Sequence, residues 1–222
     1  MIKKKSLVDQ VYEHLREGIL TLRIPLGGKL NVNELQNDLE VSCTPIREAV
    51  NRLQQEGLVT YENNVGAHVL TLNAHDVEEI QQLAMALHCA AIRLAMERGK
   101  REAILPELKR QMEEYHKAKS VQAEVNAINR FLGAFYRNCG NRRLDKSMLS
   151  IQGQQLLLRH IYVSSQAVRA GDGDYFHRML DGAGQGDGEA VCAALQEYTD
   201  HTTPEILRWV DDNYGIASAN HR

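Results

Sequence analysis

The segment from residue 41 to 59, VSCTPIREAVNRLQQEGLV, constrains the fold of this chain most strongly, because two different faces repeat in it at helical spacing. One face is an apolar stripe with intervals of four and three residues, formed by Ile46, Val50 and Leu53. The other face carries Thr44, Arg47 and Asn51, whose side chains can hydrogen-bond to base edges and phosphates. This pattern predicts a short helix that packs on a core and presents polar groups to a DNA groove.

The segments on either side of this helix predict a winged helix-turn-helix. Apolar residues at intervals of four, four, four and three indicate an amphipathic helix near the start, namely Leu7, Val11, Leu15, Ile19 and Leu22. A second short helix carries Leu35 and Leu39, and Gly57 is expected to end the third helix. Two short β-like runs, at 58–62 and 67–71, then flank a loop rich in Asn and Gly, which suits a hairpin.

After this hairpin the pattern changes and predicts a second domain made of helices. Asn73 and Asp76 are typical of a helix N-cap and its first turn. Apolar residues recur at helical spacing beyond them, without a convincing strand, and predict an antiparallel bundle of about six helices. The expected fold class is therefore mainly α, with a winged helix-turn-helix domain at 1–72 and an all-α domain at 73–222.

The charge of the chain argues against a generic nucleic-acid binder. Its formal net charge is −3 at pH 7, and the first 70 residues hold 8 basic and 9 acidic side chains. A strongly basic surface is the usual footprint of nonspecific binding to phosphates. If this segment binds DNA, its affinity must depend on the local arrangement of a few side chains and on dimerisation.

The sequence carries no signal for a membrane or for secretion. It lacks an apolar run of 18 residues, and its basic start is not followed by the apolar segment of a signal peptide. Its four cysteines are far apart, without the paired spacing of a zinc site or a disulfide framework: Cys43, Cys89, Cys139 and Cys192. We therefore expect a cytoplasmic protein with reduced thiols.

Residues spread over the first 70 positions match the DNA-binding domain of one bacterial family. They lie at 15–16, 19–20, 25, 27, 30, 34–35, 42–50, 53, 56–59, 66 and 69. With these residues the segment resembles the GntR family of transcription regulators, which implies a winged helix-turn-helix that binds operator DNA. The resemblance implies DNA contacts at six positions: Asn33, Ser42, Cys43, Thr44, Arg47 and Gly66. Cys43 stands where the family usually has Arg, so one guanine or phosphate contact is expected to be missing.

The helical part, over most of residues 76–215, resembles the all-α effector-sensing (FCD) domain of the FadR-type branch of that family. Many such relatives bind a metal through one Asp and three His, at the positions held here by Ile128, Leu132, Phe176 and Tyr198. The family's usual pocket Arg and Glu are replaced by Met85 and His88. Because these side chains do not suit a divalent ion, we expect no metal and no cofactor. The six residues indicate either an apolar pocket for a small molecule or a filled core.

Two alternatives to this interpretation stay open. If the alignment is shifted by one residue, His177 takes a ligand position and could join His201 or His160 in the metal site of a metal-dependent regulator. The chain could also be a ligand-binding or oligomer-forming protein whose head no longer binds DNA. Enzyme activity is not expected, since the glycine-rich segment 182–188 follows no strand and no catalytic signature is present.

We expect a bacterial one-component transcription regulator that acts as a repressor. A homodimer with two-fold symmetry would place two recognition helices on palindromic double-stranded DNA. The helical domain would dimerise and, in the pocket alternative, bind a small apolar metabolite. The expected partners are thus operator DNA, a second copy of the chain and a small molecule, without a membrane.

Overall fold

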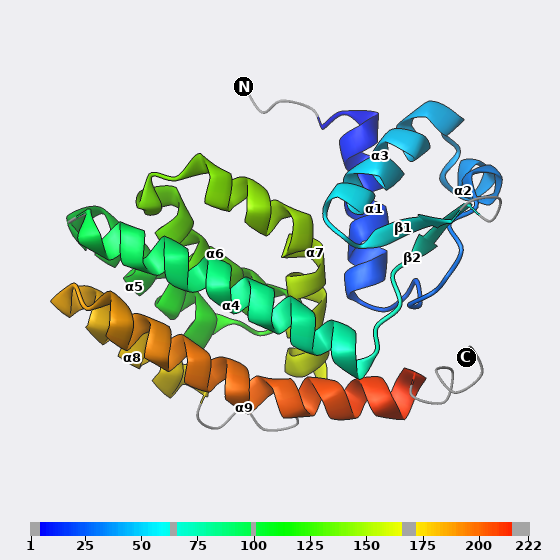
Figure 1. Cartoon of the computed structure of the whole chain (residues 1–222). Coiled ribbons are helices and arrows are strands. Elements are labelled where there is room, and N and C mark those ends of the chain that lie inside the picture. Colours follow the sequence, from blue (N-terminus) through cyan, green and yellow to red (C-terminus); the bar gives the residue numbers. More distant parts are fainter. Residues whose placement is uncertain (1–4, 63–65, 99–100, 166–171, 215–222) are drawn as a thin grey trace. The chain divides into compact units, whose positions relative to one another are not determined.

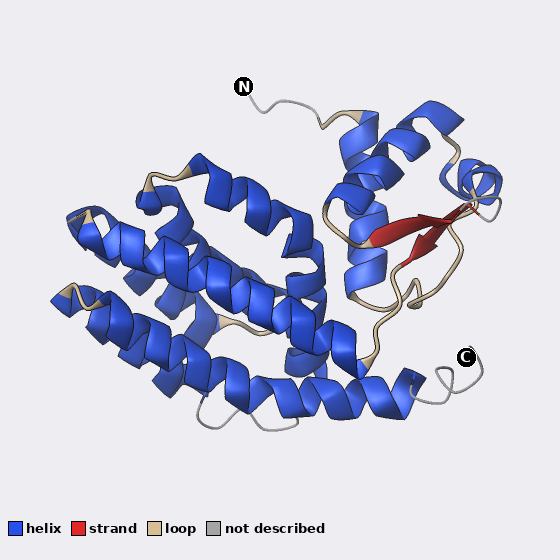
Figure 2. Cartoon of the chain, viewed as in Figure 1, coloured by secondary structure: helices blue, strands red, loops and turns tan. Residues whose placement is uncertain are grey.

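The computed structural model describes four stretches of the chain: residues 5–62, 66–98, 101–165 and 172–214. They are mainly helical, as the sequence predicts (Figures 1 and 2). The chain divides into two compact units. The first contains Met1–Leu72 together with Leu149–Leu157, and the second contains Asn73–Met148 and Leu158–Arg222. A search of the described residues for a helix with the length and hydrophobicity of a membrane span finds none.

The first unit has three helices followed by a two-stranded antiparallel sheet, so the predicted winged helix-turn-helix is confirmed. In chain order its elements are α1 (Leu7–Leu20), α2 (Val32–Leu39), α3 (Cys43–Gln55), β1 (Val59–Glu62) and β2 (Gly66–Val69). The strands pair from Val59 opposite Val69 to Glu62 opposite Gly66. The rest of the predicted wing loop, at 63–65, lies outside the described residues.

Local sequence explains where these helices begin and end. Ser6 and Asp9 form a capping box at the start of α1. Glu40 takes a left-handed conformation between α2 and α3, with φ 53°, and Gly57 does so directly after α3, with φ 74°. The predicted apolar stripe of α3 is completely buried: Ile46, Val50 and Leu53. The sequence pattern around α3 therefore fixes both its inner face and its end.

The second unit is a helical bundle, and its described part has six helices, as the sequence predicts. They are α4 (Ala74–Glu97), α5 (Arg101–Lys117), α6 (Val121–Cys139), α7 (Arg142–Ser165, of which 149–157 belong to the first unit), α8 (Asp172–Gln185) and α9 (Gly188–Tyr214). Helix α4 packs against α6 and α9, α5 packs against α6 and α8, and α8 packs against α9. The predicted cap of α4 is present, because Asn73 and Asp76 form a capping box.

Candidate functional site

The polar face of α3 is exposed, as a helix that binds DNA requires. Thr44, Arg47 and Asn51 are all exposed, on the side of α3 away from its buried stripe. Among the described residues Arg47 has no hydrogen-bond or ion-pair partner. Thr44 lies in the first turn, where main-chain N–H groups and the positive end of the helix dipole favour a phosphate. The structure thus brings these three side chains together on one accessible face.

Arg16 on α1 and Arg52 on α3 are, by contrast, paired with carboxylates of the same unit. Nε of Arg16 lies 2.9 Å from a carboxylate oxygen of Glu56, and Nη1 of Arg52 lies 2.8 Å from one of Asp9. The guanidinium of Arg52 also lies 4.0 Å from the centre of the Tyr12 ring, as in a cation–π contact. These contacts attach α3 to α1. Sequence reasoning missed them, because the partners are 40 or more residues apart.

Glu56, the C-cap residue of α3, is the centre of this attachment. It is 7% exposed, and its carboxylate accepts hydrogen bonds from Tyr12 Oη and Arg16 Nε. Burial of Tyr12, together with its hydrogen bond to the Glu56 carboxylate, raises the pKa of the Tyr12 phenol to about 12. The phenol therefore stays protonated and continues to donate to Glu56 at neutral pH.

The other predicted DNA contacts lie on the same unit. Asn33 is exposed in the first turn of α2, and its main-chain N–H donates to Asn31 Oδ1 at 3.0 Å. Ser42 occupies the N-cap position of α3, but its hydroxyl forms no capping hydrogen bond, and its side chain is exposed. Cys43 is half-buried at the start of α3. Gly66 begins β2 with φ 106°, and no atom lies within 4 Å of where its Cβ would be.

Five of the six residues predicted for the effector pocket are buried in the bundle: His88, Ile128, Leu132, Phe176 and Tyr198. The last four belong to one hydrophobic cluster, in which the rings of Phe176 and Tyr198 have their centres 5.0 Å apart. Met85 differs, because it is only half-buried at the edge of this cluster. The close packing of the buried residues favours the filled-core alternative for this part of the bundle.

His88 belongs to a buried polar cluster. Its Nδ1 lies 3.1 Å from Tyr136 Oη, and its Nε2 lies 3.4 Å from Nη2 of Arg159. The other terminal nitrogen of Arg159, Nη1, donates to Asn129 Oδ1 at 3.2 Å. Because a guanidinium only donates, Nε2 accepts and Nδ1 carries the proton of the neutral ring. Burial and, secondly, the charge of Arg159 lower the pKa of His88 to about 3. Sequence reasoning missed Arg159, since arginines on helices are mostly exposed.

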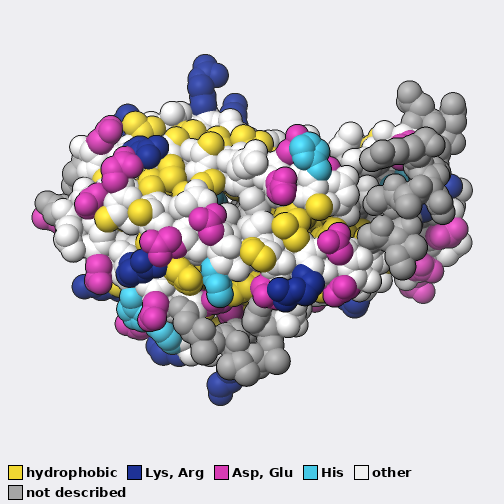
Figure 3. Space-filling model, turned by 60° about the horizontal axis from the view of Figure 1, so that its bottom comes forward, with side chains coloured by type: hydrophobic (Ala, Val, Ile, Leu, Met, Phe, Trp, Pro, Cys, Tyr) yellow, Lys and Arg dark blue, Asp and Glu magenta, His cyan; other side chains and the backbone are white. Residues whose placement is uncertain are grey.

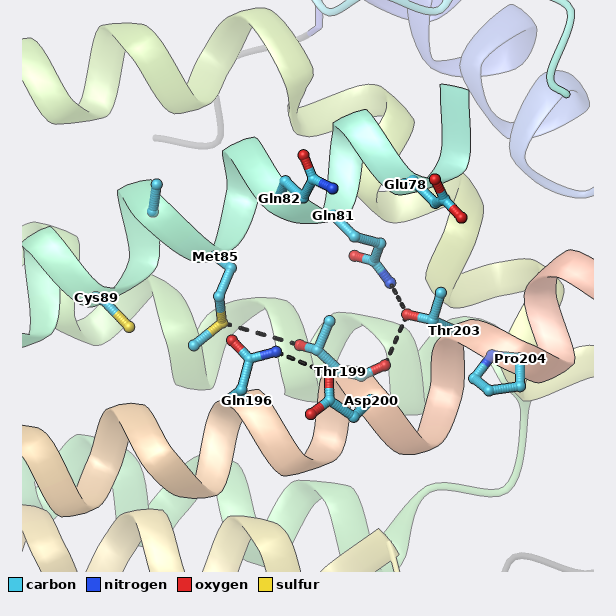
Figure 4. A pocket seen from close by; sticks show the side chains of 11 residues that line it. Glu78, Gln81, Gln82, Met85, Cys89, Gln196, Thr199, Asp200, Thr203 and Pro204 are labelled. Atoms are coloured by element: carbon cyan, nitrogen blue, oxygen red, sulfur yellow. Dashed lines mark hydrogen bonds between the residues drawn. The ribbon is translucent and has the colours of Figure 1, made fainter. Parts of the chain in front are cut away.

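A groove of about 750 Å³ lies between α4 and α9 (Figure 4). Met85 and Cys89 line it from α4, and Thr199 and Thr203 line it from α9. Nε2 of Gln81 donates to Thr203 Oγ1 at 3.3 Å, and Thr199 Oγ1 donates to the Met85 sulfur at 4.0 Å. The groove therefore offers sulfur, hydroxyl and amide groups to a small molecule.

The described residues contain no group of three or more His, Cys, Asp and Glu side chains that could hold a metal ion. The ring of His177 lies beside that of His116, with their centres 5.4 Å apart. His201 instead lies with its Nε2 3.5 Å from a carboxylate oxygen of Asp172, and His160 is buried. The three histidines of the metal alternative are thus not gathered into one site.

Two family models match the chain. The model of the bacterial regulatory proteins of the gntR family matches residues 7–69, which hold the winged helix-turn-helix. The FCD domain model matches residues 79–201, which are more than half of the chain and most of the helical bundle. Both matches agree with the resemblance inferred from the sequence.

Curated relatives are named as transcription regulators. The chain is similar to an HTH-type transcriptional regulator, YdhC, of Bacillus subtilis, with 32% identity over 49% of this chain and 48% of that protein. It is 40% identical to the Nta operon transcriptional regulator of Aminobacter aminovorans over 33% of this chain and 35% of that protein. A probable D-xylose utilization operon transcriptional repressor of Paenarthrobacter nicotinovorans is 32% identical over 42% of each chain. Each match spans less than half of the relative's length.

Solved structures share the fold. A GntR transcriptional regulator from Rhodococcus sp. RHA1 has a TM-score of 0.68 at 22% identity and covers 91% of this chain and 98% of its own. McbR/YncC of E. coli has the same TM-score at 19% identity and covers 92% of this chain and 99% of its own. The two family models, which match residues 7–69 and 79–201, show that the chain belongs to the bacterial gntR family of transcription regulators and carries an FCD domain.

Proposed function

We propose that this regulator binds a palindromic operator as a homodimer, through the polar face of α3, and represses transcription until a small molecule binds its helical unit. The main observation in support of the DNA contact is that the Arg47 side chain is exposed and unpaired among the described residues. It is exposed between Thr44 and Asn51, whereas Arg16 and Arg52 of the same unit are paired with carboxylates. An accessible guanidinium can form two hydrogen bonds to a guanine edge in the major groove, with discrimination of about 1–3 kcal/mol.

A domain for each task is part of this proposal, with DNA binding at 1–72 and dimerisation and sensing at 73–222. The division of the structure after Leu72 supports it, while Leu149–Leu157 belongs to the first unit. Repression is supported by one relative, which is named a probable operon repressor. The site of action would be the cytoplasm, because that is where a bacterial operator lies.

Dimerisation through the helical unit is supported by an uncovered part of α4. Leu83 is 48% exposed, and Leu87 and Ala90 are half-exposed four and seven residues further on. Residues at these intervals share one side of a helix. On the face drawn in Figure 3, apolar side chains are exposed among acidic and basic ones. A second copy would cover such a surface, and two-fold symmetry would then match a palindromic operator. A Leu83→Glu substitution should therefore produce monomers in sedimentation velocity.

The effector would enter the groove between α4 and α9 at Met85. This site is open without separation of the Phe176 and Tyr198 rings, and it combines apolar and polar groups. A metabolite that binds there should raise the melting temperature by mass action, and Met85→Glu should abolish the increase. If Met85→Glu still shows the same increase in melting temperature, the groove is not the binding site. If no metabolite in a broad screen raises the melting temperature of the wild type, the filled-core alternative is favoured.

The operator contact is tested by the affinity of Arg47→Ala for DNA taken from upstream of the regulator's own coding sequence, measured by fluorescence anisotropy. The variant should bind this DNA about 10- to 100-fold more weakly than the wild type, because it loses a bidentate base contact. Arg23→Ala is the matched control, since Arg23 is also exposed but lies in the turn after α1. Equal binding by Arg47→Ala and wild type would contradict the proposal.

The dependence of binding on salt separates this function from the alternative with a head that no longer binds DNA. Contacts to phosphates release counterions, so specific binding must weaken steeply between low and physiological salt. A wild-type protein without salt-dependent affinity for any upstream fragment would favour the ligand-binding or oligomer-forming alternative.

A further inference from the structure

Two cysteines, one from the first helix of the helical unit and one from its last helix, lie next to each other beside the groove between α4 and α9. Cys89 lies in the middle of α4, and Cys192 lies in the second turn of α9. The Cys192 sulfur is 3.9 Å from the main-chain oxygen of Cys89, so the two cysteines lie next to each other. Both side chains are buried, with 8% and 5% exposure. Two cysteines can be joined by a disulfide only where the fold holds them close together, and an oxidant must also reach one of them.

The groove supplies that access to one thiol of the pair. Cys89 is among its lining residues, and Figure 4 shows its sulfur directed from α4 toward α9. Cys192 is not a lining residue of the groove. A small oxidant that enters the groove from solvent therefore reaches Cys89 before it reaches Cys192.

Electrostatics divides the roles of the two thiols in the same way. The hydrogen bond from Cys192 and, less strongly, the Arg93 guanidinium lower the pKa of Cys89, although burial opposes them. Arg93 follows Cys89 by one turn of α4 and is held by Glu189 through two contacts of 2.6 and 2.8 Å. The hydrogen bond to Cys89 and burial raise the pKa of Cys192. The thiolate is the reactive form, so Cys89 is the nucleophile of the pair.

We propose that Cys89 and Cys192 form a modification site for hydroperoxides, in which oxidation links α4 to α9 through a disulfide. In the first step the Cys89 thiolate attacks the peroxide, its sulfur takes one oxygen to form a sulfenic acid, and an alcohol or water leaves with the proton. In the second step the Cys192 sulfur attacks that sulfenic acid, the S–S bond forms, and the hydroxyl leaves as water. Two thiols and one peroxide thus give one disulfide, one alcohol or water from the peroxide, and one water.

The site is separate from the other two cysteines, which provide controls. Cys43 is half-buried at the start of α3, in the first unit. Cys139 is buried at the end of α6, where its sulfur lies 3.2 Å from the main-chain oxygen of Tyr136. A Cys43→Ser background therefore removes the thiol that could react on the DNA-binding unit and leaves three thiols in the full-length chain.

The experiment exposes the Cys43→Ser protein to hydrogen peroxide and then counts free thiols after denaturation. The count should fall from three to one, and peptide mapping should recover a Cys89–Cys192 linked pair that dithiothreitol separates. A Cys139→Ser substitution in this background should still lose two thiols. With Cys192→Ser the linked pair must disappear, and dimedone should label Cys89 as the trapped sulfenic acid.

Three results would overturn the proposal. They are an unchanged thiol count in protein whose far-ultraviolet circular dichroism is native, a link that involves Cys139, and a dimedone label at Cys192 instead of Cys89. Peptide mapping of the oxidised Cys43→Ser protein does not depend on any substitution in the bundle. The proposal therefore remains testable even if Cys192→Ser fails to fold.

Discussion

The buried His88 should make the helical unit lose stability in mild acid. Its pKa is lowered to about 3 from an ordinary value of 6.5, by burial first and then by the charge of Arg159. Between these two values an unfolded chain binds a proton at this position and the folded chain does not. Stability rises with increasing pH, and falls with decreasing pH, wherever the unfolded state binds more protons. The stability contributed by neutral His88 is therefore complete above pH 6.5 and is lost as the pH falls below it.

The size of this effect follows from the ordinary pKa. At pH values below the ordinary pKa, each further decrease of one pH unit lowers the free energy of unfolding by about 1.36 kcal/mol for each proton that only the unfolded state binds. Between about pH 7 and about pH 5 the free energy of unfolding should therefore fall by about 2 kcal/mol through His88 alone. This magnitude does not depend on how far below pH 4 the folded-state value lies.

Urea unfolding followed by tryptophan fluorescence measures this loss, because the single tryptophan, Trp209, lies in α9 of the helical unit. A His88→Gln variant retains an amide that can hydrogen-bond but does not titrate, so its stability should fall less over the same range, by about 2 kcal/mol. His75→Gln is the matched control for the loss of an imidazole, because His75 is exposed on the same helix. Equal slopes for wild type and His88→Gln would refute the reasoning.

Three further substitutions test the local structure by urea unfolding followed by circular dichroism. Glu56→Ala should destabilise the first unit by about 2–3 kcal/mol, because Tyr12 and Arg16 lose a buried acceptor, and an unchanged midpoint would show that these bonds contribute nothing. Gly57→Ala should lower the free energy of unfolding by about 1–2 kcal/mol or more, because φ is 74° and the new Cβ would lie 2.9 Å from a main-chain oxygen. A variant as stable as the wild type would contradict the left-handed conformation of Gly57. Asn73→Ala should cost about 1 kcal/mol through loss of the α4 cap, whereas Asn73→Ser should cost much less.

Much of the fold could be predicted from the sequence, because the relevant signals are local. The stripe of α3, the glycine that ends it and the capping box at Asn73 involve residues within one or two turns of each other. Such patterns depend on backbone geometry that hardly varies between proteins. Ser42 shows a limit of such patterns, because it occupies the N-cap position of α3 and yet its hydroxyl forms no capping hydrogen bond. A residue type permits a cap without enforcing the side-chain rotamer that makes it.

The candidate DNA-binding face could be predicted only as a set of residue types. Arg47 and Arg52 lie on one helix five residues apart, and their sequence neighbourhoods do not distinguish a base-reading arginine from a structural one. The difference arises from Asp9 and Tyr12 on α1, which take Arg52 and leave Arg47 exposed. The charge count of the first 70 residues does not reveal this difference between the two arginines, since a count cannot show which charges pair with each other.

Local chemistry along the chain was sufficient to define the helices, the hairpin and the polar face of the recognition helix, since a helix period or a glycine turn acts over a few residues. Contacts between distant positions, such as His88 with Arg159 or Cys89 with Cys192, exist only once the helices are assembled. Burial and neighbouring charge then change the pKa values of these side chains, and a linear sequence specifies neither.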